Sequence, residues 1–257
     1  MMSKRDKKEY IRNLIIAGAT VYKNDLAGKS FLYIYGDECF EVVFETKQFK
    51  HLTGVESNIG AQTFYKYAVR GRLTINQFGF SSRHPYDTAK EKLNCIPMLS
   101  QLTNDVVCVL KDFQTVTITY TLGITNLKFT LGLISKGVGN NIFIPQTLRI
   151  KDKAIENSGA AEFVDFILVK DGSASLYTDV SYADAGKFFP NKFFHFLAEP
   201  LKRRMLKDGF IENAYEMNDE FQTVLQNAIT TAEQRKESEA PKTQEQHLRS
   251  LGHNPLK

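Results

Sequence analysis

The sequence predicts an α+β protein in which N-terminal helices pack on a mostly antiparallel sheet, followed by a C-terminal helical extension. Three observations support this fold class. The first part of the chain alternates helix-like and strand-like segments. The middle contains period-two runs rich in Val, Ile, Thr and Tyr, which are typical of antiparallel strands. The last part places phenylalanines at spacings typical of helices.

The N-terminal part is expected to contain three helices and a hairpin. A first helix is predicted because apolar residues recur at helical spacing until Gly28 breaks the pattern. Pro97 is expected to kink or shorten the third helix, since proline cannot donate the helical hydrogen bond. The expected elements are a helix over 6–25, strands over 31–35 and 39–44 joined by Gly36-Asp37-Glu38, a helix from Ser57 or Asn58 to Arg70, a short extended segment over 74–80, and a helix over 86–102.

The middle of the chain predicts an antiparallel meander, and the C-terminal part predicts helices. The expected strands are 106–110, 116–122, 127–134, 142–150 and 163–169. Helices are expected within 184–208, interrupted at Pro190 and Pro200, and over 218–236. The predicted organisation is a domain over 1–180, a helical extension over 181–236 and a polar, disordered tail over 237–257.

Composition excludes several classes of protein and allows an anionic partner. The chain has 257 residues, 42% hydrophobic content and a formal net charge of +4, which is only mildly basic. It contains no apolar run long enough for a membrane span and no signal-peptide h-region. Three widely spaced cysteines indicate reduced core residues of a cytoplasmic protein, and no ligand spacing indicates a metal site.

One short stretch brings together the residue types of acid–base chemistry. The segment Phe49-Lys50-His51-Leu52-Thr53-Gly54 lies between the predicted hairpin and the second helix. An imidazole can take and give a proton near neutral pH, so His51 is a candidate general base or acid. The alternative is a polar residue that ends a strand. Lys66, on the helix that follows, is a candidate cation for the same site.

A row of cations near the end of a predicted strand could bind phosphate. If residues 149–153 are extended, Arg149, Lys151 and Lys153 point the same way, because side chains of a strand alternate between faces. Arginine binds phosphate oxygens bidentately, and lysine adds a point charge. Together with His51, these cations would suit metal-free RNA cleavage. The row is equally compatible with a solvated strand face.

Other candidates have ordinary structural interpretations as well. Ser158 lies between strands and could act at the site or form a turn. Tyr65 could stack on RNA bases or belong to the core. His84 precedes Pro85 in a turn, and the sequence shows no partner for it. Nucleotide-loop, nucleophile-elbow, zinc-protease and kinase motifs are absent, which argues against most cofactor-dependent classes, so no cofactor is expected.

Several segments also resemble a known family. They are 28–33, 40–44, 49–55 and 64–65, with a looser match over 145–152 and 162–167. This set resembles the phage-associated nuclease-like domains grouped with barnase, EndoU, the tRNase colicins and RelE, and in particular the fourth of those phage groups. The resemblance covers roughly residues 9–180, and the phrase Phe-x-His-Leu-Thr-Gly is its most distinctive part.

The resemblance implies a barnase/EndoU/RelE-like domain with metal-independent endoribonuclease activity and a toxin or effector role in a phage or other mobile element. His51 and Thr53 are mapped from the shared phrase, and Arg149 from the distal run. Thr53 would orient the scissile phosphate, while Arg149 with Lys151 or Lys66 would stabilise the phosphorane. Lys66, Lys151 and Ser158 are added from spacing alone.

These observations leave three functional hypotheses. The first is an endoribonuclease acting on RNA, with tRNA as one candidate, in the cytoplasm of a bacterial host. The second is a non-catalytic RNA- or protein-binding module that uses the same sheet. The third is a structural or regulatory phage protein whose C-terminal helices do the work. Those helices could also bind an antitoxin or a phage protein. No membrane partner is expected.

Overall fold

Residues 1–210 form one compact unit in the computed structural model, which describes residues 2–115, 118–150 and 155–211. The α-helices are α1 (Lys4–Asp25), α2 (Phe49–Thr53), α3 (Ala61–Val69), α4 (Tyr86–Cys95), α5 (Gln101–Asn104) and α6 (Glu199–Lys207). The 3₁₀ helices are η1 (Thr46–Gln48), η2 (Ile96–Met98) and η3 (Asn191–Phe196). The unit thus combines helices with a large sheet.

The large sheet has the strand order β11-β10-β1-β2-β8-β7-β6-β5-β9. Its strands are β1 (Lys29–Tyr35), β2 (Glu38–Val43), β5 (Cys108–Gln114), β6 (Thr119–Thr125), β7 (Phe129–Ser135), β8 (Ile142–Ile150), β9 (Ala160–Phe163), β10 (Phe166–Asp171) and β11 (Asp179–Ala183). Only the β2–β8 pairing in this sheet is parallel among the described strands. A separate two-stranded sheet pairs β3 (Glu56–Ser57) with β4 (Phe78–Gly79).

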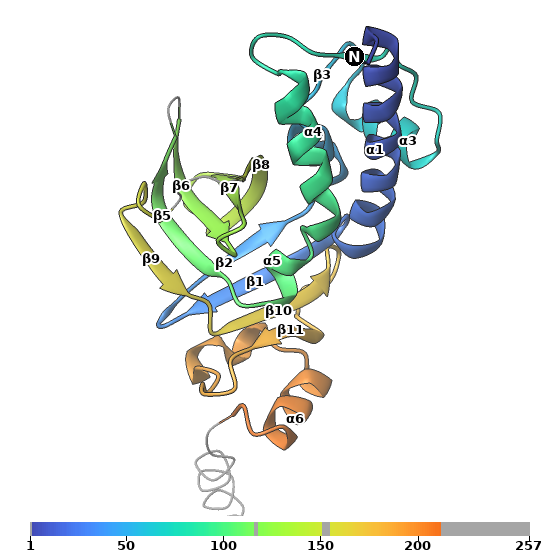
Figure 1. Cartoon of the computed structure of the whole chain (residues 1–257). Helices are drawn as coiled ribbons and strands as arrows, with labels where there is room; N and C mark the ends of the chain where they lie inside the picture. The colour runs from blue at the N-terminus through green and yellow to red at the C-terminus, as the bar shows by residue number, and fades with distance from the viewer. Residues whose placement is uncertain (1, 116–117, 151–154, 212–257) are drawn as a thin grey trace, which may run out of the picture. The chain divides into compact units, whose positions relative to one another are not determined.

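The large sheet curls until its two halves meet (Figure 1). Strand β9 is at one edge and β10 is the second strand from the other, yet only Val164 and Asp165 separate them. The Val164 amide donates to the Val107 carbonyl before β5, and the Asp165 amide donates to the Ile34 carbonyl on β1. The buried Asp165 carboxylate accepts the Gly36 amide at 2.7 Å. These bonds join the two halves through the backbone.

The helices α1, α3 and α4 lie together beside the strands β1, β2 and β8 (Figure 1). Helix α1 begins with a capping box between Ser3 and Asp6 and buries the stripe Ile11, Ile15 and Tyr22. The Tyr22 hydroxyl donates to the Glu45 carbonyl at 2.9 Å, which ties α1 to the segment after β2. That segment continues into η1 and α2, so the position of α2 depends on this contact.

The chain after β10 is part of the same compact unit. Strand β11 adds an edge to the large sheet, and the Phe189 amide donates to the Phe210 carbonyl. Both of these phenylalanine rings pack edge-on against Phe166 of β10. The domain boundary predicted after residue 180 therefore falls inside β11. The predicted helix over 218–236 and the tail over 237–257 lie outside the described residues.

The predicted α+β class with a mostly antiparallel sheet is confirmed. The first helix, the hairpin, the meander and the break near Pro97 occur as expected, and Pro190 and Pro200 stand at the starts of η3 and α6. The His51 segment, for which no element was predicted, forms the helix α2. Two local expectations were wrong. Ser57 belongs to β3, whereas α3 is capped by Gly60. The predicted strand 163–169 is two strands.

Candidate active site

A pocket of about 550 Å³ lies where α2, α4 and the β3 region meet strands β6 and β8. It gathers two histidines, two lysines, a tyrosine and a glutamate from segments far apart in the sequence. The lining residues are Lys50, His51, Gly54, Val55, Glu56, Ser57, His84, Lys92, Tyr120, Gln146 and Thr147. Such a convergence of titratable groups in a cavity is typical of an active site.

His51 is placed at the pocket by the short helix α2. Phe49 and Leu52 are fully buried and anchor the helix, while His51 is exposed on its outer side. Gly54 ends the helix with φ +71°, a left-handed conformation that glycine adopts without strain. Partial burial, and to a smaller extent the charge of Lys50, lower the pKa of His51. A lowered pKa favours the neutral imidazole, which can accept a proton.

Lys92 reaches the pocket from α4 with its aliphatic stem against the end of α2. A Cβ atom at Gly54 would lie 2.8 Å from Lys92 Cδ, so any other residue would require this stem to shift. Burial, together with the nearby charge of Arg149, lowers the pKa of Lys92 to about 8. Arg149 is on β8, next to the same pocket. Lys92 therefore remains mostly charged at neutral pH but gives up its proton more readily than an ordinary lysine.

Tyr120 on β6 and Thr147 on β8 form the floor of the pocket, and Gly132 of β7 lies between them. A Cβ atom at Gly132, on the strand between them, would lie 2.8 Å from Thr147 Cγ2 and 3.3 Å from the Tyr120 ring. The tyrosine ring can therefore lie across β7 and hydrogen-bond with Thr147. Burial raises the pKa of Tyr120, whereas Arg149 and Thr147 act in the opposite direction. The phenol stays protonated and can donate a hydrogen bond.

His84 is held by Glu56 at the β3 side of the pocket. Its Nδ1 lies 3.1 Å from Glu56 Oε1, and the Ser81 hydroxyl donates to the same oxygen at 2.6 Å. The hydrogen bonds from Ser81 and His84 lower the pKa of Glu56. An ionised carboxylate only accepts hydrogen bonds, so Nδ1 carries the hydrogen and Nε2 is the second nitrogen available to the pocket.

The predicted site residues separate into different parts of the unit. Arg149 lies close enough to Lys92 and Tyr120 to affect both pKa values. Thr53 is fully buried, and its hydroxyl donates to the Lys50 carbonyl at 2.7 Å within α2, so it does not face the pocket as the phosphate-orienting role required. Ser158 bonds to the Ile155 carbonyl at 2.9 Å in the turn before β9 and does not line the pocket.

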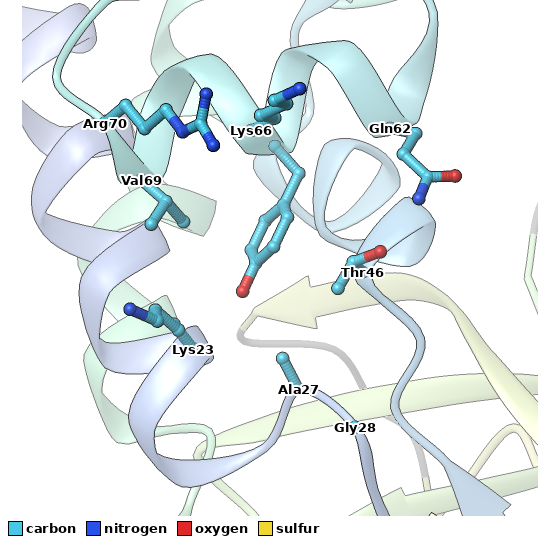
Figure 2. Close-up of a pocket in the computed structure, with 9 residues that line it drawn as sticks. Lys23, Ala27, Gly28, Thr46, Gln62, Lys66, Val69 and Arg70 are labelled. Carbon is cyan, nitrogen blue, oxygen red and sulfur yellow. The ribbon is translucent and has the colours of Figure 1, made fainter.

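Lys66 (Figure 2) and Tyr65 lie on α3 and line a second pocket. Neither of them lines the pocket that contains His51. Lys151 and Lys153 lie outside the described residues. The single constellation expected from the sequence is therefore divided. His51 and Arg149 belong to one region, whereas Lys66 and Tyr65 belong to another.

The sequence alone did not indicate that Lys92, the His84–Glu56 pair and Tyr120 belong to the candidate site. Lys92 left a detectable signal, because it occupies the i+3 position of the apolar stripe Ala89, Leu93 and Ile96, where a lysine is unexpected. His84 and Glu56 are 28 residues apart, and nothing in the sequence connects them. Tyr120 looked like an ordinary core residue of a strand.

Two further properties bear on the chemistry. Within the described parts of the chain, no cluster of three or more His, Cys, Asp and Glu side chains is arranged to hold a metal ion. No described helix is long and apolar enough to cross a membrane.

Comparison with known proteins identifies the family. The model of the family described as phage-Barnase-EndoU-ColicinE5/D-RelE like nuclease4 (PBECR4) matches residues 14–185, most of the chain. The chain belongs to this family. It is thus assigned to the phage-associated nucleases of the barnase, EndoU, colicin and RelE type. The matched region contains every residue that lines the His51 pocket. No curated protein and no solved structure shows significant similarity.

Substitution of Gly132 by alanine should disturb the floor of the pocket. The new methyl group would clash with Thr147 and the Tyr120 ring, so we expect a loss of about 1–3 kcal/mol in the free energy of unfolding. Gly123→Ala is a matched control, because Gly123 is paired with Gly132 across the strands and its Cβ would make ordinary contacts of 3.5 Å or more. Equal effects of the two substitutions in urea denaturation would contradict this account.

Proposed function

We propose that this protein is a metal-independent endoribonuclease that cleaves RNA by transesterification. The 2′-oxygen of a ribose forms a bond to the adjacent phosphorus while the bond from phosphorus to the 5′-oxygen breaks. The products are a 2′,3′-cyclic phosphate and a free 5′-hydroxyl. The observation that carries this proposal is that His51, His84 and Lys92 line one pocket.

The reaction needs one group that removes the 2′-hydroxyl proton and one that protonates the leaving oxygen. His51 suits the first task, because its lowered pKa favours the neutral imidazole. His84 suits the second task, since Glu56 fixes its ring through Nδ1 and leaves Nε2 to deliver the proton. After the reaction, a proton exchange with water restores both groups.

Charge accumulates on the phosphorane oxygens, and cations fixed in advance stabilise it. Lys92 provides a charge that its burial makes effective, and Arg149 adds a second charge beside it. The protonated phenol of Tyr120 can donate to a phosphate oxygen from the floor of the pocket. In this mechanism Arg149 keeps the role expected from the sequence, and Lys92 replaces Lys66.

The same set of groups favours RNA over DNA as the substrate. A general base and a general acid are sufficient when the nucleophile is already part of the substrate. The ribose 2′-hydroxyl is adjacent to the scissile phosphate, whereas deoxyribose lacks it. Family membership is compatible with this chemistry. We further propose a toxin or effector role in the cytoplasm of a bacterial host, with tRNA as one candidate substrate.

Replacement of either pocket histidine should remove most of the activity. We expect His51→Ala and His84→Ala each to lower the rate of RNA cleavage in EDTA by about 10²–10⁴-fold, the usual contribution of a general acid or base. Mass spectrometry of the products should show 2′,3′-cyclic phosphate ends, and an oligomer of the same sequence in DNA should stay intact.

His195→Ala is the matched control, because His195 is an exposed histidine of η3 that does not line the pocket. It should retain activity within about twofold, a change too small for a general acid or base. Full activity of His51→Ala would overturn the assignment. Tight RNA binding without any cleavage by the wild type would instead support the non-catalytic binding hypothesis.

The pH dependence of kcat/KM should identify the two perturbed groups. Activity should fall as the pH drops through the pKa of His51, because protonation removes the base. As the pH rises through about 8, Lys92 loses its charge, and this loss should add to the fall in activity that follows when the general acid is no longer protonated. Lys92→Arg keeps its charge, so the ratio of kcat/KM at about pH 9 to that at about pH 7 should be larger than in the wild type. An unchanged ratio would contradict the role of Lys92.

A further inference from the structure

A second pocket, of about 530 Å³, gathers three cations from α1 and α3. Lys23 comes from the last turn of α1, and Lys66 and Arg70 come from the end of α3 (Figure 2). Thr46 and Gln62 lie on the opposite side of the hollow. The apolar part of its lining includes Ala27, Val69 and Tyr65.

The three cations have no carboxylate partner within the described parts of the chain. Among the described residues, no Asp or Glu lines this pocket, and none forms an ion pair with Lys23, Lys66 or Arg70. Elsewhere on the unit, the half-buried Lys111 and the exposed Lys192 are paired with glutamate and aspartate, respectively. Lys66 and Arg70 also repel each other, since they are four residues apart at the end of one helix. Their positive field favours an anion in the hollow.

The two pockets are joined by a single continuous segment. Thr46 at the start of η1 lines the cationic pocket, and Lys50 and His51 on α2 line the active-site pocket. Helical rises of about 1.5–2.0 Å per residue place Thr46 and Lys50 roughly 6–8 Å apart along this segment. A strand of a duplex carries one phosphate for every 3.4 Å or so of helical rise, so a separation of this length corresponds to a few nucleotides.

We propose that the cationic pocket is an RNA subsite that binds the phosphate backbone a few nucleotides from the scissile bond. This inference rests on the proposed ribonuclease function, and it gives Lys66 a different role from the catalytic one expected from the sequence. The subsite selects single-stranded RNA of several nucleotides over a dinucleotide. Thr46 and Gln62 offer polar groups to a sugar or base, and the cations hold the phosphates.

The test compares two triple variants that remove the same charge. K23Q/K66Q/R70Q neutralises the subsite, and K4Q/K128Q/K207Q neutralises three exposed lysines outside both pockets. The first should weaken binding of a 12-nucleotide RNA to the His51→Ala protein at least about tenfold and reduce the slope of log K against log salt by about two, since each lost phosphate contact removes roughly 0.7. The control should have a much smaller effect on both quantities.

Cleavage assays give a second measurement that is independent of the binding assay. In the His51-containing protein, K23Q/K66Q/R70Q should raise the KM for the 12-nucleotide RNA and reduce the preference for it over a ribodinucleotide. Equal loss of binding in the two triple variants would overturn the subsite. If K23Q/K66Q/R70Q loses RNA binding, the control variant does not, and the wild type does not cleave RNA, the subsite is supported and the proposed ribonuclease activity is rejected. Circular dichroism checks that both variants fold, and Lys66→Gln alone should show a smaller effect in the same direction.

Discussion

The partial burial of Lys92 beside Arg149 is the constraint on which the candidate site depends. An ammonium group loses hydration when it is buried, and a neighbouring arginine adds repulsion, so the charged lysine is held at an energetic cost. An anion in the pocket would relieve both effects. Lys92 takes this position at the junction of α4 with α2, and the proposed function gives its charge a use in binding phosphate.

The backbone makes this arrangement possible. Gly54 lets the Lys92 stem cross the end of α2, and Gly132 lets Tyr120 lie across β7 toward Thr147. The curl of the sheet places β6 and β8 beneath the helices, and Asp165 holds the two halves of that curl together. The geometry of the site thus depends on two glycines that leave space for neighbouring side chains, and on contacts outside the pocket that close the sheet.

Local pattern was enough to predict the α+β class, the hairpin and the meander, and it singled out His51, which lines the candidate pocket. It could not predict the parallel β2–β8 pairing or the direct passage from β9 to β10, because both depend on the closure of the sheet. Their closeness in the sequence also suggested that Lys66 lies beside His51. In the structure, the turn at Gly54 and the β3 region separate α2 from α3, and Lys66 lines another pocket. The His84–Glu56 pair depends on a contact between two segments that only the fold brings together.

The most direct test of the central claim is an NMR titration of Lys92, with its resonance assigned through Lys92→Arg. In the free protein we expect a pKa of about 8. Saturation with a 2′-deoxy analogue of a cleavable RNA should raise it toward the ordinary lysine value, because a bound phosphate stabilises the ammonium form. A pKa near 10.5 in the free protein, or one that does not change on saturation, would contradict a phosphate-binding lysine in this pocket.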